Sequence, residues 1–168
     1  MTTPCPFDLS GPYVYDLSMR VLWIESIADT QAPTDVEVAT GVVLNNAPYH
    51  LTDIIGWELD TEKIPDDRWG PQVGERLGEQ EVADAEMRFT ASRDGVDVRS
   101  LWDRGDLGNI VFFPSGPYLS YPTAPIQVFP VRVSQITQRQ ELRQPASILR
   151  VVFAIKVGVG NNVFVVGP

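Results

Sequence analysis

The 168-residue chain has very little of the side-chain chemistry on which enzymes and metal sites most often depend. It contains one cysteine, Cys5, one histidine, His50, and only two lysines. A single cysteine excludes a disulfide framework, and one imidazole cannot build a zinc site from the usual histidine and cysteine ligands. We therefore expect no metal and no cofactor, and we interpret Cys5 as incidental and His50 as a surface or strand residue.

Motifs of the common catalytic classes are also missing. Neither a Gly-x-Ser-x-Gly nucleophile elbow nor a Gly-x-x-x-x-Gly-Lys-Ser/Thr phosphate loop occurs. The glycine pairs in Gly105–Gly108 and Gly158–Gly160 lack the third glycine of a dinucleotide site. Paired carboxylates such as Asp66 and Asp67 leave a glycosidase open only in principle, because that reaction depends on a separation in space that a sequence does not give. We expect that the protein is not an enzyme.

Long apolar runs and an excess of basic charge are absent as well. No run of about 18 apolar residues exists, and Met1–Ser10 has neither a basic flank nor an apolar core, so we expect neither a membrane span nor a signal peptide. The chain has 13 basic and 22 acidic residues, a net charge of −9. General nucleic-acid binders neutralise phosphates with a basic face, so this balance argues against that class.

Acidic and basic residues occupy different parts of the chain. Asp53–Glu86 holds eleven acidic and three basic residues, a balance of −8, whereas Ile126–Pro168 holds five basic residues and one acidic residue, a balance of +4. The two segments are electrostatically complementary and could attract one another across an interface. The alternative is that the acidic segment is a solvated loop that keeps the protein soluble.

The dominant pattern is an alternation of apolar and polar residues with a period of two, which is typical of half-buried β-strands. It is clearest in Glu86–Ser92, where Met87, Phe89 and Ala91 share one face. We expect Leu149–Val157 and the preceding Ile126–Thr137 to be long strands that pair antiparallel through the polar connection Gln138–Ser147. Further strands are predicted at Met19–Ile27, Val36–Leu44, Leu51–Leu59, Asn109–Phe113 and Asn162–Val166.

Only one segment has the pattern of a helix. Asp94–Arg104 has Asp94 or Asp97 as a cap, Gly105 as a stop, and an apolar stripe formed by Val98, Leu101 and Trp102. Such a stripe covers an open end or face of a β structure. The expected fold class is mainly β: an antiparallel sandwich or barrel with one short flanking α-helix and long loops, in a single domain over residues 1–168.

Two stretches rich in proline and glycine, Ile64–Gly78 and Pro114–Pro125, are predicted to be long loops. Loops of this length are uncommon in a compact domain unless they bind something. Trp69 lies in the first loop, and Tyr118 and Tyr121 lie in the second. These aromatic residues either form a binding platform for a carbohydrate or peptide or fix the loops to the core.

The order of elements after residue 82 resembles that of the major tail tube proteins of long-tailed bacteriophages. The resemblance rests on AEMRFTASRD from Ala85 to Asp94, on the short helix with Leu101-Trp102, and on GDLGNIVFFPSG from Gly105 to Gly116. In that family a strand leads into a helix, a glycine-containing turn and a strand that ends in a small loop. Pro130–Thr137 and Ile148–Val157 would match the closing strands, so the similarity covers about Val82–Val157.

The resemblance implies a β-sandwich or barrel with one flanking helix, whose copies join edge to edge into hexameric rings. The rings stack into the tail tube, through which DNA passes. The expected partners are therefore further copies of the chain, other tail proteins and DNA in transit, with no membrane binding. The implied location is the virion tail, with assembly in the host cytoplasm. Residues 1–18 would form an extended N-terminal arm and residues 60–81 a long acidic loop.

The charge pattern then suggests roles for particular residues. An acidic wall would repel DNA phosphates and keep DNA from adhering, and Asp60, Glu62, Asp66 and Asp67 are the candidates for that wall. The basic C-terminal strands would pair with acidic loops of neighbouring copies. The candidate contacts between copies are Trp69, Tyr118, Tyr121, Arg139 and Arg143.

Alternative functions remain open from the sequence. Within the structural class, the chain could be a tail terminator, a head-tail connector or a capsid decoration protein. A β-sandwich that binds a receptor or glycan would use Trp69, Tyr118 and Tyr121 and would lose its ligand on Trp69→Ala. An enzyme would show a pH dependence tied to a carboxylate, since the chain offers no other acid-base group.

Overall fold

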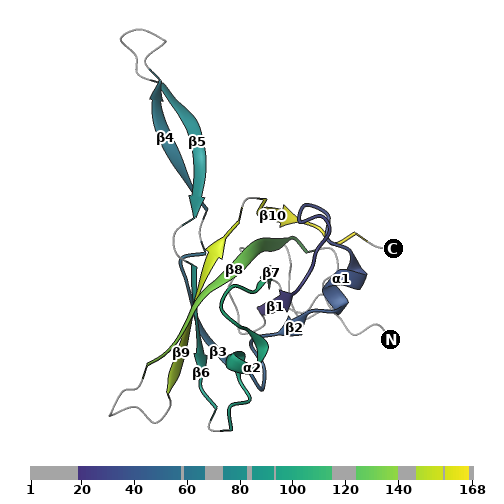
Figure 1. The fold of residues 1–168 in the computed structure, drawn as a ribbon. Coiled ribbons are helices and arrows are strands. Elements are labelled where there is room, and N and C mark those ends of the chain that lie inside the picture. The colour runs from purple at the N-terminus through teal and green to yellow at the C-terminus, as the bar shows by residue number, and fades with distance from the viewer. Residues whose placement is uncertain are drawn as a thin grey trace. The chain divides into compact units, whose positions relative to one another are not determined.

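The fold is mainly antiparallel β structure with two short helices, as a computed structural model shows (Figure 1). The structure describes residues 19–57, 59–66, 74–82, 85–92, 94–114, 124–139, 147–156 and 158–166. The chain divides into two compact units. Unit 1 takes Met1–Asn45, Gly108–Pro130 and Val157–Pro168, and unit 2 takes Asn46–Leu107 and Val131–Lys156. The predicted mainly β class is confirmed.

Unit 1 is built on a sheet whose central strands are β1 and β7. β1 (Arg20–Ile24) pairs antiparallel with the short β2 (Val42–Val43) on one side and with β7 (Leu107–Phe113) on the other. β7 neighbours the first part of β8 (Ile126–Arg139), and β10 (Gly160–Val163) pairs with β8 as well. Alternate apolar positions on these strands produce the unit's core, which consists of Leu22, Ile24, Val38, Val111, Phe113, Ile126, Val128 and Val163.

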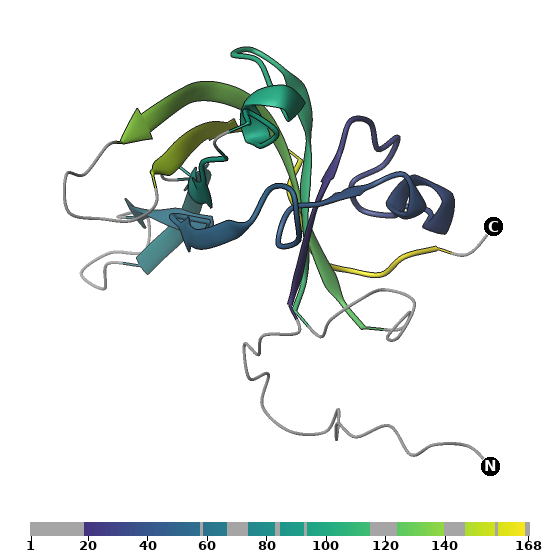
Figure 2. The same cartoon turned by 90° about the horizontal axis from the view of Figure 1, so that it is seen from below.

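The first helix, α1 (Asp35–Ala39), occupies the first part of Val36–Leu44, where the alternation predicts a strand. That prediction is correct only for β2 (Val42–Val43), and the expectation of a single helix is wrong. Thr34 and Glu37 form a capping box: the Thr34 hydroxyl accepts from the Glu37 N–H, and the Glu37 carboxylate accepts from the Thr34 N–H at 2.8 Å. α1 lies beside the C-terminal segment (Figure 2), and the Asp35 N–H donates to the Val166 carbonyl at 3.1 Å.

Gly108 on β7 is required by the close approach of a tryptophan ring. A Cβ added at this position would overlap the ring of Trp23, which is 3% exposed and has little freedom to move. Gly108→Ala should therefore lower the free energy of unfolding by about 1–3 kcal/mol, the usual cost of overpacking a core. Urea denaturation followed by tryptophan fluorescence measures the loss. Val36→Ala, at a site 66% exposed, is the control, and an equal loss in both variants would contradict the explanation.

Unit 2 contains a sheet in the order β8-β9-β6-β3, in which each neighbouring pair is antiparallel. Its strands besides β8 are β3 (Leu51–Ile55), β6 (Ala85–Thr90) and β9 (Ile148–Ile155). β8 and β9 pair from Val131 opposite Ile155 to Arg139 opposite Ile148, which confirms the predicted antiparallel pair. One face of this sheet is apolar and buried, through Met87 and Phe89 on β6 and Val151 and Phe153 on β9.

The predicted helix over Asp94–Arg104 is confirmed in place, but it is shorter. α2 (Val98–Leu101) begins after Asp97, which is its N-cap, and Gly105 has the positive φ of 102° expected at a stop. Trp102 follows α2 and packs edge-on against Phe89 and Phe153, with ring centroids 5.7 and 5.3 Å apart. This contact places the α2 segment on the apolar face of the unit 2 sheet.

β4 (Leu59–Asp66) and β5 (Gly74–Val82) form a separate two-stranded sheet. The prediction of a long loop over Ile64–Gly78 is therefore wrong at both ends of that stretch. Pro65 is tolerated because a two-stranded sheet has open edges, where a missing N–H costs no ladder bond. The register shifts by one residue between Thr61 and Lys63, which brings Gly78 into an irregular part of β5. In the described residues no helix is long and apolar enough to cross a membrane.

Candidate functional site

The unit 2 sheet ends in two strand edges, and the β8 edge is the more distinctive. Up to Val133 the outer side of β8 is hydrogen-bonded: the Val133 N–H donates to the Asp106 carbonyl and the Val133 carbonyl accepts from the Gly105 N–H, both at 2.8 Å. The register then shifts between Val133 and Gln135, which makes Ser134 the extra residue of a bulge. Among the described residues, no backbone partner lies on the outer side of β8 from Ser134 to Arg139.

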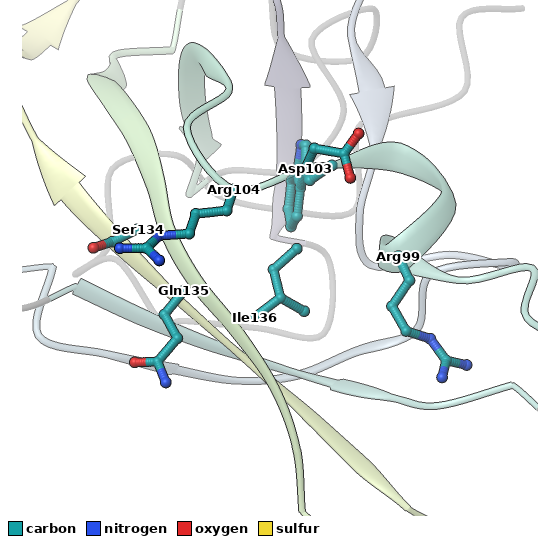
Figure 3. Close-up of a pocket in the computed structure, with 7 residues that line it drawn as sticks. Arg99, Asp103, Arg104, Ser134, Gln135 and Ile136 are labelled. Carbon is teal, nitrogen blue, oxygen red and sulfur yellow. The ribbon is translucent and has the colours of Figure 1, made fainter.

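A cavity of about 730 Å³ lies beside this open edge (Figure 3). Its apolar lining comes from Trp102, which is 2% exposed, and from the half-buried Ile136. Its polar lining consists of Arg99, Asp103, Arg104, Ser134 and Gln135. Arg104 extends from its loop toward β8, whereas Arg99 belongs to α2. We call this cavity, together with the β8 backbone from Ser134 to Arg139, the β8 edge groove.

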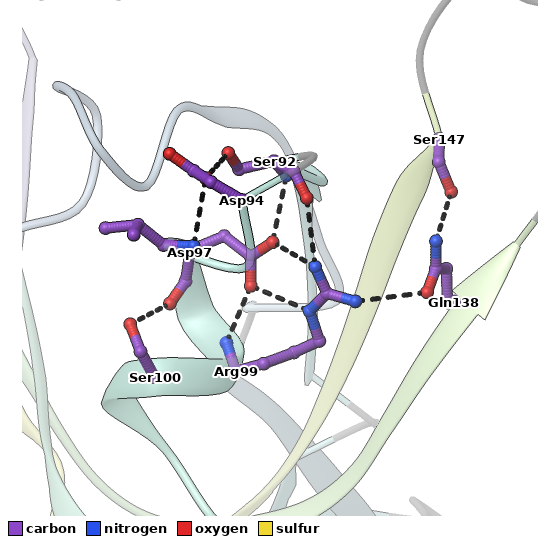
Figure 4. A network of polar contacts seen from close by, with 8 residues as sticks. Ser92, Asp94, Asp97, Arg99, Ser100, Gln138 and Ser147 are labelled. Atoms are coloured by element: carbon purple, nitrogen blue, oxygen red, sulfur yellow. Dashed lines mark hydrogen bonds and ion pairs between the residues drawn. The ribbon is translucent and has the colours of Figure 1, made fainter.

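An ion pair between the buried Asp97 and the exposed Arg99 fixes the wall of the β8 edge groove (Figure 4). The Asp97 side chain is fully buried and accepts from the Ser92 N–H at 2.9 Å, the Arg99 N–H at 3.0 Å and the Arg99 guanidinium at 2.6 Å. These bonds, the guanidinium bond first, outweigh burial and lower the pKa of Asp97 to about 2. Asp97 is therefore ionised at neutral pH, and it holds Arg99 in one position.

Arg99 connects α2 to the ends of β8 and β9 by hydrogen bonds between side chains. Its Nη1 donates to Gln138 Oε1 at 3.2 Å, and Gln138 Nε2 donates to Ser147 Oγ at 2.9 Å. Its Nη2 also donates to the Ser92 carbonyl at 3.1 Å. The α2 segment and the open end of the sheet are thus joined by side chains, as Figure 4 shows. What this arrangement provides is a preformed surface next to unpaired backbone, which suits binding of another strand.

The opposite edge of the same sheet is β3. Its residues Leu51 and Ile54 lie opposite the buried Phe89 and Met87, so they are on the apolar face, and both are half-buried. Trp57 follows β3, where its Nε1 donates to the Glu86 carbonyl at 3.1 Å and its ring packs 5.5 Å from that of Phe153. Both edges of the sheet therefore end in apolar side chains that are only partly covered.

The second face of the unit 2 sheet is polar and carries a ladder of charges. Glu86 on β6 accepts from Arg88 Nε at 2.8 Å and from Arg150 Nε on β9 at 2.5 Å. Arg88 Nη1 also lies 3.5 Å from the Asp53 carboxylate on β3. Burial raises the pKa of Glu86, but the bonds from Arg88 and Arg150 outweigh it, so the net pKa is lowered. We call Asp53, Glu86, Arg88, Arg132 and Arg150 the charged face.

The residues proposed from the sequence are only partly within the described structure. Asp60, Glu62 and Asp66 occupy alternate positions of β4, and Asp60 lies directly opposite Glu81 of β5. Arg139 is the last residue of β8 and pairs with Ile148. Asp67, Trp69, Tyr118, Tyr121 and Arg143 lie outside the described residues, as does Cys5. His50 is exposed, directly before β3, in agreement with its interpretation as a surface residue.

The structure adds residues that the sequence did not single out for function. Alternation places Glu86 and Arg88 on one face, but Arg150 is 64 positions from Glu86 and only the strand register brings the two together. The sequence predicts Asp97 only as a candidate helix cap, and the ion pair of this buried carboxylate with Arg99 goes beyond that role. Among the described residues, no group of acidic, histidine or cysteine side chains could hold a metal ion.

Comparison with known families matches residues 16–168 of the chain to the family described as phage tail tube protein. The chain belongs to the phage tail tube protein family. The resemblance seen in the sequence from Val82 to Val157 is confirmed and extends over nearly the whole chain. This tail tube protein is accordingly a structural component of the virion tail, in a family that assembles with itself and with other tail proteins. No curated protein matches the sequence.

Proposed function

We propose that copies of this tail tube protein close into hexameric rings through the two edges of the unit 2 sheet, and that stacked rings form the channel through which DNA passes. The observation that carries the proposal is the backbone of β8 from Ser134 to Arg139, whose outer side has no partner in the part of the chain that the structure describes, with the β8 edge groove beside it. Unpaired strand edges are a liability in a monomer, and closure of a ring removes them.

The strand directions fit such a contact. The order β8-β9-β6-β3 is antiparallel throughout, so β8 and β3 run in opposite directions. A rotation about an axis along the strands leaves these directions unchanged. The β3 edge of one copy would therefore meet the β8 edge of the next in antiparallel orientation, the same pairing as within each copy. Such a head-to-tail contact produces a closed ring when the rotation between neighbouring copies is a whole fraction of a full turn.

The side chains at the two edges fit as well. The apolar lining of the β8 edge groove, Trp102 and Ile136, belongs to the same face of the sheet as Leu51 and Ile54 at the β3 edge. Pairing of the edges would cover the half-buried Ile136, Leu51 and Ile54 and continue the apolar layer from one copy into the next. Burial of apolar surface contributes about 25 cal/mol per Å², so this layer would supply a substantial part of the association energy.

Disulfide trapping tests the edge assignment. We replace Cys5 by serine and introduce one cysteine on β3, at Thr52 or Asp53, and one on β8, at Gln135 or Thr137. Mild oxidation of assembled protein should give covalent oligomers in a ladder that ends at the hexamer, because each copy then has a bond on both sides. Either cysteine alone can give dimers at most, which is the matched control.

The outcomes separate the choice of strand edges from the assembly of rings itself. Rings or tubes in negative-stain micrographs without a ladder from any cysteine pair would show that other edges join the copies. A monomer of constant size over a concentration series, without rings, would overturn the assembly proposal and favour a binding module. The contact roles of Trp69, Tyr118, Tyr121, Arg139 and Arg143 stay predictions under the same scheme.

We further propose a role for the hairpin of β4 (Leu59–Asp66) and β5 (Gly74–Val82), which we call the acidic hairpin. Asp60, Glu62, Asp66 and Asp67 would add negative charge to the channel. The β4–β5 register supports this, because it sets Asp60 opposite Glu81 and concentrates acidic positions on one ribbon. A two-stranded sheet is only marginally stable by itself. The hairpin therefore gains from contact with a neighbouring copy.

A further inference from the structure

The charged face of unit 2 has a composition that an acidic channel wall does not explain. Asp53 lies opposite Arg88, and Arg150 lies opposite Thr137, on the face that alternates with the buried residues Met87 and Val151. Arg132, exposed and opposite Ala154, belongs to the same face. Three arginines thus share this face with two carboxylates.

The ion pairs on the charged face leave the arginines accessible. The side chains of Arg88 and Arg150 are 40% and 48% exposed, whereas Glu86 between them is only 9% exposed. One buried carboxylate therefore holds two exposed guanidinium groups at 2.8 and 2.5 Å. Glu86 accepts from the Nε of each guanidinium, so it takes one donor of Arg88 and one of Arg150 and places a negative charge beside both, which weakens their attraction for a phosphate.

The position of α2 decides which face of the sheet would line a channel. Trp102 and the buried Val98 pack on the apolar face, so the α2 segment covers it. When a sheet closes into a barrel, one face turns inward, and elements that cover a face need the space outside. If copies join through β3 and β8, the charged face is the inner one. This step rests on the proposed function.

We infer that the charged face contacts the phosphates of DNA in transit, and that Glu86 keeps Arg88 and Arg150 paired so that neither holds a phosphate. The partner is a polyanionic duplex that must slide without being retained. Each arginine that neutralises a phosphate releases counterions and raises affinity in a salt-dependent way. A wall in which Arg88 and Arg150 are paired internally has less of this affinity than a wall with three unpaired arginines, and it avoids the stronger repulsion of a purely acidic wall.

Removal of the shared carboxylate tests the inference on assembled tubes. Glu86→Gln removes the carboxylate that Arg88 and Arg150 share and leaves Arg88 only its longer contact with Asp53. We therefore expect tubes of this variant to retain a short fluorescent DNA duplex about tenfold more strongly than wild-type tubes at 50 mM salt. At 200 mM salt the difference should largely disappear. Glu25→Gln removes an equal charge from an exposed site in unit 1 and should change nothing. The triple variant Glu86→Gln, Arg88→Gln, Arg150→Gln should return retention to the wild-type level.

A second measurement covers the case in which Glu86→Gln does not assemble. In a Cys5→Ser background, Ala154→Cys places a single thiol on the charged face, at an exposed position. In tubes, a small maleimide should label Ala154→Cys, and a protein-sized maleimide should not. Equal labelling of Ala154→Cys by both reagents, or equal DNA retention by Glu86→Gln and wild-type tubes, would overturn the inference. Absence of tubes from the wild-type protein would instead overturn the proposed function.

Discussion

Replacement of Trp102 by alanine should lower the free energy of unfolding by about 3–5 kcal/mol, the largest single loss expected in the protein. Trp102 is 2% exposed and makes edge-on contacts with Phe89 and Phe153. Its removal leaves a cavity between the α2 segment and the sheet, and well-oriented ring pairs add to the cost of lost burial. Urea denaturation followed by circular dichroism measures the change.

The control for Trp102→Ala is Leu107→Ala, at an apolar site that is 48% exposed. We expect that variant to stay within about 0.5 kcal/mol of the wild type. Because Trp102 also lines the β8 edge groove, the alanine variant should form fewer rings even under conditions in which it is folded. A loss below about 1 kcal/mol would mean that α2 does not depend on this ring.

Asp97→Asn should cost about 2 kcal/mol at neutral pH, and the cost should depend on pH. The asparagine still caps α2, but it loses the charge-assisted bonds to Arg99. The pKa of Asp97 is about 2 in the folded protein and 3.8 by itself, and each unit corresponds to about 1.4 kcal/mol. Because the folded pKa is lowered, this stabilisation is present above pH 3.8 and is lost as pH falls through about 2.

Urea midpoints of wild type and Asp97→Asn at pH 7, 4 and 2 test this expectation. The two proteins should differ most at pH 7 and converge at pH 2, whereas other carboxylates affect both proteins equally. Asp103→Asn, at an exposed site in the next turn, removes the same charge and should leave the wild-type profile unchanged. A difference between wild type and Asp97→Asn that stays constant over this range would mean that the charge of Asp97 plays no part.

The strands with a clear two-residue period were predictable, because local alternation is set by which side chains meet the core. Glu86–Ser92 and the pair Ile126–Thr137 and Leu149–Val157 match β6, β8 and β9 within a few residues. The prediction over Val36–Leu44 is correct only at Val42–Val43, because Thr34 and Glu37 form a capping box, a local helix signal that outweighs the strand preference of the valines.

The hairpin and the charged face show what local pattern leaves undetermined. Prolines and glycines near Pro65 and Gly74 favour a loop, yet a two-stranded ribbon with open edges accommodates both residue types. The bond between Arg150 and Glu86 depends on pairing between strands far apart in sequence. Register is fixed by the assembled core, so neither this ladder nor the β8 edge groove could be derived from spacing.

β8 has a thermodynamic consequence of its own. Its 14 residues begin in unit 1, where they pair with β10, and end in unit 2, where they pair with β9. If the residues of β8 that pair with β10 unfold, the ladder between β8 and β9 loses its continuation and its end opens more readily. Heat would be absorbed over one shared transition rather than two, and a substitution in either core would shift the melting of the whole chain.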